Sequence, residues 1–194
     1  MFCSLIKQGI IMEREEYGIV LDFLPNGYPF DTRPSHKKTP IAQVLGTKRF
    51  SLLEVVPKRD IHLDLSDNIY MGEGKRDHVH HINGRISYDK LTNTARSNLE
   101  FSIKELIHKT EDPYLEFFNK AQPLSTRMHA MELLPGIGKK HMWEILDERR
   151  DGDFKSFDDI RKRVKLIPDP ENLILKRILK ELAEPEKHLL FVDK

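Results

Sequence analysis

Two different periods of hydrophobic residues divide the chain near Leu91. Before this point, short apolar runs alternate with turn residues, a spacing typical of strands. The expected strands are 17–24, 41–46, 50–56, 68–72 and 78–86. Strands this short and this evenly spaced predict a small barrel or a sandwich. The segment 25–40 carries prolines at 25, 29, 34 and 40 and is expected to be a long loop.

After Leu91, the apolar residues recur at the spacing of a helix. Leu99, Ile103, Leu106 and Ile107 fall on one stripe, which predicts an amphipathic helix over roughly 94–109. A second short helix is expected after Pro113. The polar segment 119–125 then indicates a boundary.

The remainder of the chain is expected to form four helices, arranged as two hairpins. Ser125 can cap a helix that runs to Leu134, and another helix is expected from Lys139 to about Arg150. Ser156 is expected to cap a third helix, and Asp169, followed by Pro170, is expected to cap a fourth. The sequence therefore predicts an α+β multidomain protein: a β-barrel domain over 1–90, connecting helices over 91–122 and an all-α domain over 123–194.

Composition indicates a globular protein without a membrane segment. Hydrophobic residues make up 39% of the chain and charged residues 32%, and no apolar run approaches the length of a membrane span. The lone Cys3 cannot form an internal disulfide, so we expect a cytoplasmic protein. The net charge is +1, so any contact with nucleic acid must come from local clusters of basic residues.

One such cluster follows the turn Pro135-Gly136-Ile137-Gly138 at an expected helix N-terminus. Unpaired backbone N–H groups and the helix dipole attract anions there, and glycine allows close approach. Lys139 and Lys140 add positive charge, and His141 is a further candidate. The residues between the glycines are too few for a Walker-type loop, and a helix rather than a strand is expected before the turn, unlike a dinucleotide fingerprint. A turn whose glycines serve only tight packing is the alternative.

The turns of the expected barrel carry a second set of basic residues. If they gather at one rim, they form a basic collar, and Tyr28 and Phe30 in the long loop offer faces for base stacking. The residues of the collar are Lys48, Arg49, Lys58, Arg59, Lys75 and Arg76. The alternative is that these are ordinary charged turns. Phe50 and Tyr70 are assigned to the core.

Two enzymatic interpretations are weaker than binding. Asp67 with Glu73 and Lys75 resembles the acidic arrangement of metal-dependent nucleases, yet Glu73 and Lys75 flank a glycine in a turn. His78, His80 and His81 lie on one expected strand and could form part of a metal site. The sequence offers no third ligand nearby to complete it. We therefore expect no catalytic residues, no metal and no cofactor.

Several motifs resemble known families. Residues 134–138, Leu-Pro-Gly-Ile-Gly, are similar to the core of the helix-hairpin-helix motif. Residues 156–183 resemble the second half of its tandem form, although the turn at 167–170 has no glycine and carries an acid. Met142 also departs from the small residue usual at its position.

The resemblance extends to nearly the whole chain from about Tyr17. The stretches "LDFLPNG", "FSLLEVVPK" and "HINGRISYDKLT" are similar to an uncharacterised archaeal family that joins an OB-like β-barrel to a tandem helix-hairpin-helix domain. Genes of that family often lie near genes for a ribosomal protein, an RNA polymerase subunit and an rRNA methyltransferase, which implies information processing.

The sequence therefore leaves two alternative hypotheses for the function. The first is a non-enzymatic protein that binds RNA or DNA, independently of base sequence, through phosphates at the turn 135–138. The second is a scaffold whose partners are ribosomal or transcription components. The near-neutral charge and the glycine-free second turn favour the scaffold.

Overall fold

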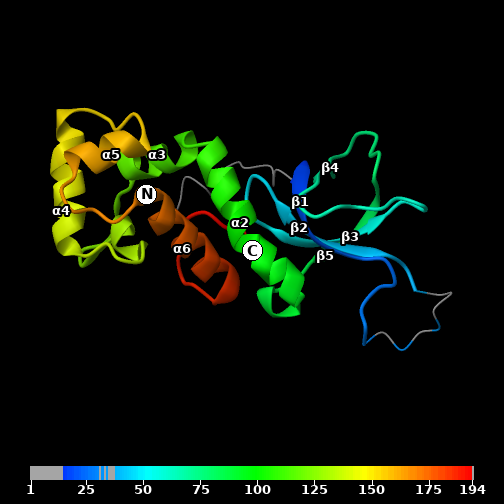
Figure 1. Cartoon of the computed structure of the whole chain (residues 1–194). Coiled ribbons are helices and arrows are strands. Elements are labelled where there is room, and N and C mark those ends of the chain that lie inside the picture. The colour runs from blue at the N-terminus through cyan, green and yellow to red at the C-terminus, as the bar shows by residue number, and fades with distance from the viewer. Residues whose placement is uncertain (1–14, 31, 33, 35–37, 194) are drawn as a thin grey trace. The chain divides into compact units, whose positions relative to one another are not determined.

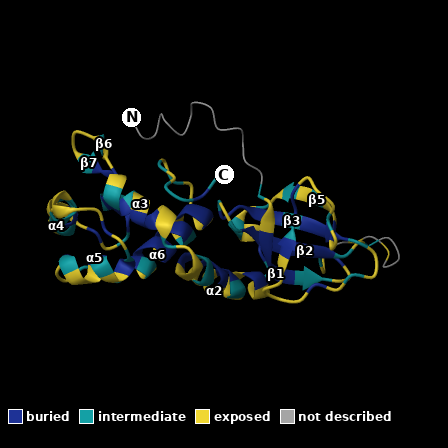
Figure 2. Ribbon diagram, turned by 90° about the horizontal axis from the view of Figure 1, so that it is seen from above, coloured by how far each residue is buried: buried dark blue, intermediate teal, exposed yellow. Residues whose placement is uncertain are grey.

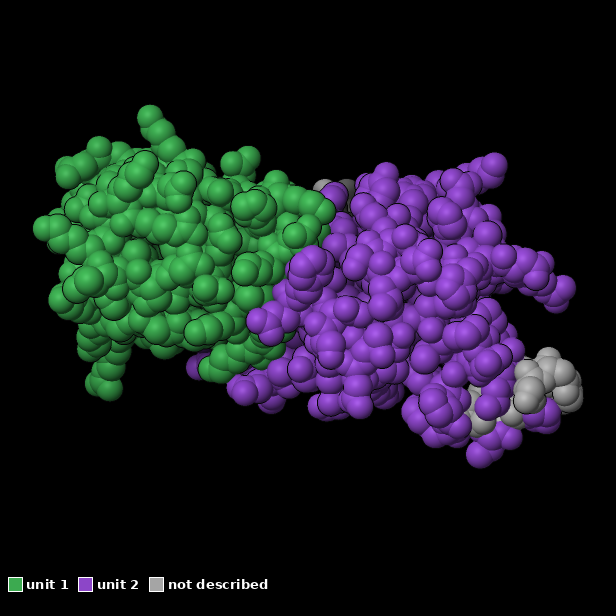
Figure 3. All heavy atoms as spheres, viewed as in Figure 1, with its two compact units in different colours: residues 1–12, 104–180 green, residues 13–103, 181–194 purple. Residues whose placement is uncertain are grey.

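The computed structural model describes residues 15–30, 32, 34 and 38–193, and the chain forms two compact units (Figure 3). Among the described residues, one unit is Lys104–Lys180, and the other joins those between 15 and 103 to those between 181 and 193. The helices α2 (Asn93–Lys109) and α6 (Pro170–Ala183) each begin in one unit and end in the other. The domain boundaries expected at 90 and 122 stay a prediction. Independent folding of 123–194 stays a prediction.

The sheet unit is built on five antiparallel strands, all of which the apolar pattern predicts. They are β1 (Tyr17–Leu24), β2 (Ile41–Gly46), β3 (Leu52–Pro57), β4 (Asn68–Tyr70) and β5 (Val79–Arg85) (Figure 1). Their order is β4-β1-β2-β3-β5. Among the described residues no ladder joins β4 to β5, so the sheet is a curled half-barrel.

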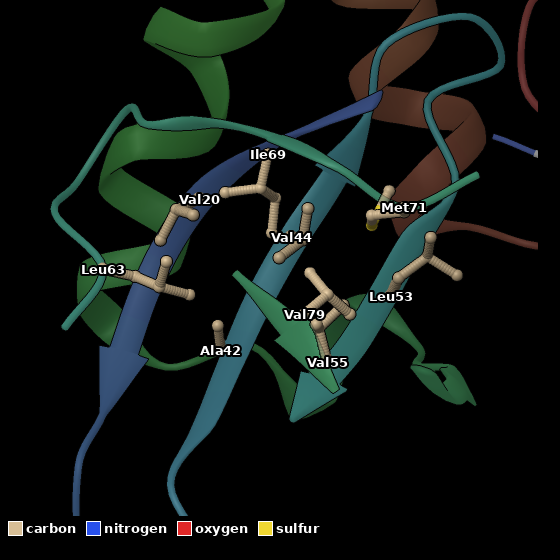
Figure 4. Packing of buried hydrophobic residues seen from close by; sticks show 9 residues of the cluster. All are labelled: Val20, Ala42, Val44, Leu53, Val55, Leu63, Ile69, Met71 and Val79. Atoms are coloured by element: carbon tan, nitrogen blue, oxygen red, sulfur yellow. The ribbon is translucent and has the colours of Figure 1, made fainter. Parts of the chain in front are cut away.

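One face of this sheet packs a core of apolar side chains, most of them branched. The cluster in Figure 4 consists of Val20, Ala42, Val44, Leu53, Val55, Leu63, Ile69, Met71 and Val79. Alternate residues of a strand point to the same face, and β-branched residues fit a pleated surface, so these runs form strands. Figure 2 shows the inner strands as predominantly buried.

A polar network ties the long loop and the start of α2 to the sheet. The amide of the buried Gln43 donates to Lys90 O (2.9 Å) and to the Tyr28 hydroxyl (3.0 Å). Tyr28 in turn donates to Glu54 (2.7 Å). Burial and this hydrogen bond raise the pKa of Tyr28 to about 12. The hydroxyl therefore remains a donor at all physiological pH values.

The segment after α6 belongs to the same unit. The buried Glu181 carboxylate accepts hydrogen bonds from the backbone N–H groups of Leu190, Phe191 and Val192 (2.8, 3.0 and 3.0 Å). One acid thereby satisfies three backbone donors, which is how a buried carboxylate avoids a large desolvation cost.

The described part of the helical unit consists of helices and a small two-stranded hairpin. After α3 (Asp112–Lys120) come β6 (Pro123–Ser125), β7 (Met128–His129) and the 3-10 helix η3 (Ala130–Leu133). The helix α4 (Lys139–Glu148) is followed by the 3-10 turn η4 (Arg149–Asp151), then by α5 (Phe157–Arg163) and α6. None of the helices in the described residues is long and apolar enough to cross a membrane.

The helix expected from Ser125 to Leu134 is wrong. The Ser125 hydroxyl accepts from Arg127 N–H (3.3 Å) and so supports a tight turn between β6 and β7. His129 caps the helical turn instead: its Nδ1 accepts from Met131 N–H (3.2 Å), while Glu132 accepts from His129 N–H (2.7 Å). The helical segment therefore begins later and extends for a single turn.

The other helix starts are as the sequence predicts. Ser156 accepts from Asp159 N–H (3.0 Å) at the start of α5, and Pro170 is the first residue of α6. The core beneath these helices is made of Phe118, Met131, Ile145, Phe157, Ile160, Ile174 and Ile178.

Candidate functional site

The turn between η3 and α4 has two glycines with different local roles. Gly136 has a φ of 99°, a conformation that L-residues with a side chain rarely adopt, so the backbone itself requires glycine there. Gly138 has an ordinary extended conformation (φ −94°, ψ 179°), and a Cβ atom added to it would meet nothing within 4 Å. Neither strain nor packing requires glycine at 138, which leaves bare backbone facing open space.

Gly138 is the N-cap of α4, and the helix presents unpaired donors beside it. The first helical hydrogen bond runs from Met142 N–H to Gly138 O (3.0 Å). The N–H groups of Lys139, Lys140 and His141 therefore have no acceptor within the helix. The amide of Ile137, expected to face a ligand, instead donates to Leu134 O (3.0 Å). Its side chain is buried and anchors the turn.

The charge at this helix end is positive. No acidic residue stands in the first turn of α4, and Lys139 and Lys140 are both exposed. Lys140 lies 4.0 Å from Glu144, a distance that leaves the ammonium group available to another anion. The helix dipole, the unpaired N–H groups and the two lysines thus all favour an anion at the same place.

The turn between α5 and α6 has the opposite character. Its helix start is occupied by the protein's own acid, since Asp169 accepts from Asn172 N–H (3.2 Å). Arg161 forms an ion pair with the same carboxylate and lies 3.6 Å from Glu171 in the first turn of α6. An external anion would meet two carboxylates here, and the absence of phosphate binding at this turn stays a prediction.

A groove that the sequence did not predict lies beside the first turn. It has a volume of about 730 Å³ and runs between the β6–β7 hairpin and α4. Lys139, Trp143 and Leu146 contribute from α4, Arg150 from η4 and Arg127 from the hairpin. Trp143 is 56% exposed within it. The available signal was the position of the only tryptophan, four residues after Lys139.

The basic turns of the sheet do not all gather at one rim. Lys58 donates to His78 O (2.9 Å) through its backbone and to Arg76 O through its side chain, so two of the three pairs lie together at the end of β3. The pair Lys48-Arg49 lies in the β2–β3 turn, at the opposite end of β3. There the Glu15 carboxylate accepts from both backbone N–H groups (2.9 and 2.8 Å).

The aromatic residues of the sheet unit differ in how far they are buried. Phe50 is buried, and the rings of Tyr28 and Phe30 stack at 5.0 Å with Phe30 79% exposed. Tyr70 is half-buried and packs edge-on against Tyr17 (5.3 Å).

The residues of the two enzymatic interpretations lie in turns and on β5. Glu73 and Lys75 are exposed in the β4–β5 connection, and the Asp67 carboxylate accepts from Asp64 N–H (2.9 Å) in another turn. His80 and His81 have their Nδ1 atoms 2.6 Å apart. Within the residues that the structure describes, no three His, Cys, Asp or Glu side chains form a group that could hold a metal ion.

Comparison with known proteins gives the family. Residues 14–193 match the model of a family described as protein of unknown function (DUF655). The chain belongs to the DUF655 family. An uncharacterised protein of Methanocaldococcus jannaschii is 42% identical over 180 residues, which are 92% of this chain and 80% of that protein.

A DUF655 protein from Archaeoglobus fulgidus has a crystal structure that is similar to this chain. The two share 45% sequence identity with a TM-score of 0.85, over 92% of this chain and all of the other. The description of the family assigns no role to the turn between η3 and α4.

Proposed function

We propose that this DUF655 protein binds RNA or DNA by gripping backbone phosphate at the N-terminus of α4. The observation that carries the proposal is the bare backbone at Gly138, where neither φ nor packing requires glycine. A glycine that the fold does not need is useful where a ligand must approach the main chain closely. The unpaired amides and two lysines that follow are suitable ligands for phosphate oxygens.

The arrangement is consistent with a divergent tandem helix-hairpin-helix domain. Residues 134–138 keep the motif's apolar residue, Pro-Gly, apolar residue and glycine, while the single 3-10 turn η3 stands in place of its first helix. The curled half-barrel is consistent with an OB-like module, whose two clustered basic turns would provide a weaker second contact.

The proposed action is binding without a chemical step. Backbone amides and ammonium groups donate hydrogen bonds to phosphate but do not shuttle protons at neutral pH. Contacts of this type read no bases, so we expect affinity to depend little on sequence. Ribosome- or transcription-related processes are the proposed setting, on the resemblance to a family with such gene neighbours.

The test compares two variants that add the same charge at the two helix starts. Gly138→Asp provides a favourable N-cap and should fold normally, but it places a carboxylate where phosphate would bind. We expect it to weaken binding of a dye-labelled oligonucleotide by about tenfold or more in low-salt anisotropy titrations. The matched control is Asn172→Asp, which adds an acid to the exposed first turn of α6 and should leave affinity unchanged.

Two results would contradict the proposal. Equal weakening by both variants, with circular dichroism unchanged, would show that net charge matters and the turn does not. An absence of binding by the native protein to duplex DNA, duplex RNA and single strands at low salt would favour the scaffold function instead.

A further inference from the structure

The groove beside the turn combines an exposed aromatic ring with four basic side chains and a single carboxylate, that of Glu132. Trp143 is 56% exposed although the indole is a large apolar group that normally packs in a core or an interface. Met142 and Leu146 also line the groove and add apolar surface to it.

The basic side chains that line the groove differ in whether they already have a hydrogen-bond or ion-pair partner. Arg149 donates to Ala121 O (3.0 Å), and Arg150 forms an ion pair with Asp147 (2.9 Å). Lys139 and Arg127 have no carboxylate partner among the described residues, and they stand on the helix and hairpin sides of the groove. A ligand that offers a flat ring and negative charge would satisfy both parts of this surface.

The groove and the proposed phosphate site share a residue. Lys139 is the first residue of α4 and also lines the groove, while Trp143 stands one turn further along the same face. Four residues of α-helix span about 6 Å along the axis, which one nucleotide can bridge. A strand held by a phosphate at the N-terminus of α4 can therefore place the neighbouring base on Trp143.

We propose that this groove binds an unstacked nucleobase of a single-stranded nucleic acid, with Trp143 as the stacking platform and Lys139 and Arg127 holding the flanking phosphates. This inference rests on the proposed function and names its substrate class. In a regular duplex the bases are stacked on each other, so the groove discriminates single strands or unpaired ends from duplexes.

Because Trp143 is the only tryptophan in the chain, its fluorescence reports on the groove alone. The probes are a thymidine oligonucleotide of about twelve residues and an abasic strand of equal length and charge, a length within the site sizes of single-strand binding proteins. We expect the thymidine strand to quench the tryptophan emission. The abasic strand should bind about tenfold more weakly and leave the emission unchanged.

The variants separate stacking from folding. Trp143→Ala should reduce affinity for the thymidine strand about tenfold and leave affinity for a duplex unchanged, whereas Trp143→Phe should retain most of the single-strand affinity. The matched control Phe101→Ala removes another exposed helical aromatic ring outside the groove and should have no effect. Circular dichroism confirms that each variant is folded.

The two proposals fail in different ways. Binding of the thymidine strand with unchanged tryptophan emission, or equal affinity for the abasic strand, would overturn the stacking site and leave the phosphate site intact. Absence of all binding by the native protein would overturn both.

Discussion

The two turns of the helical unit connect similar elements but provide for anions in opposite ways. At the α5–α6 turn, Asp169 caps the helix and pairs with Arg161, so the protein supplies its own negative charge. At the η3–α4 turn the cap is Gly138, which has no side chain, and the residues that follow are lysines. At both helix starts the unpaired N–H groups need an acceptor or an anion. The α5–α6 turn fills that position with Asp169, whereas the η3–α4 turn leaves it open.

The comparison also separates the two glycines of the first turn. Gly136 resembles Leu166 near the second turn, because both hold a positive φ (99° and 58°) that reverses the chain. Gly138 has no counterpart of this kind. A turn can therefore be built without the second glycine, and we propose that Gly138 serves a ligand.

The largest effect on stability is expected at Gly136. Gly136→Ala forces a side chain into a left-handed conformation and should cost about 1–2 kcal/mol of unfolding free energy. Gly138→Ser has an allowed backbone and a good N-cap residue, so it should be neutral or slightly stabilising. Urea denaturation measures both, and equal costs at the two positions would mean that the glycines do not have separate roles.

A smaller effect is expected at the cap of the second turn. Asp169→Ala removes the acceptor for Asn172 N–H and should destabilise the protein by about 1 kcal/mol. Nucleic-acid affinity should stay the same, because this turn is not expected to bind phosphate. A loss of affinity in a variant that remains folded at the assay temperature would break the asymmetry between the turns.

The smallest effect concerns His129, the cap of η3. Burial, together with the nearby Arg149, lowers the pKa of His129, so the folded protein favours the neutral imidazole. The unfolded chain takes up the proton first, at about pH 6.5. Stability should therefore fall as the pH drops below about 6.5 toward the lower folded pKa.

The control for this pH dependence is His129→Asn, which can still cap η3 but does not titrate. The variant should show a flatter decline of melting temperature with acid than the native protein. A decline as steep as that of the native protein would assign the acid sensitivity to other groups.

The spacing of hydrophobic residues predicted the helices and strands well in segments where one spacing dominates. The five strands and α2 agree with the expected ranges to within a few residues, because alternation and the stripe through Leu99 and Ile103 are properties of short segments. The helix expected at 125–134 failed because side-chain hydrogen bonds at Ser125 and His129 favour a hairpin and a late cap. Capping residues serve turns as well as helices, so residue type alone does not decide between them.

The candidate site was predictable only in part, for a related reason. The Pro-Gly-Ile-Gly pattern is local, and it indicated the turn, the helix start and the two lysines. The groove depends on the β6–β7 hairpin, which brings Arg127 to the face of α4 that carries Trp143. Since the hairpin was not expected, neither was the groove. The basic turns illustrate the same limit, because strand register decides which of them meet.

The most direct test of the phosphate site is the salt dependence of binding to duplex DNA. The amides at the start of α4, two lysines and a few arginines would neutralise about three or four phosphates, so log affinity should fall against log salt with a slope of roughly −3 to −4. Unrelated duplex sequences should give the same slope. The double variant Lys139→Ala with Lys140→Ala should flatten it by about one to two, while Lys162→Ala with Lys165→Ala, beside the second turn, should not. A slope unchanged by loss of the first pair, or a steep preference for one base sequence, would contradict the account.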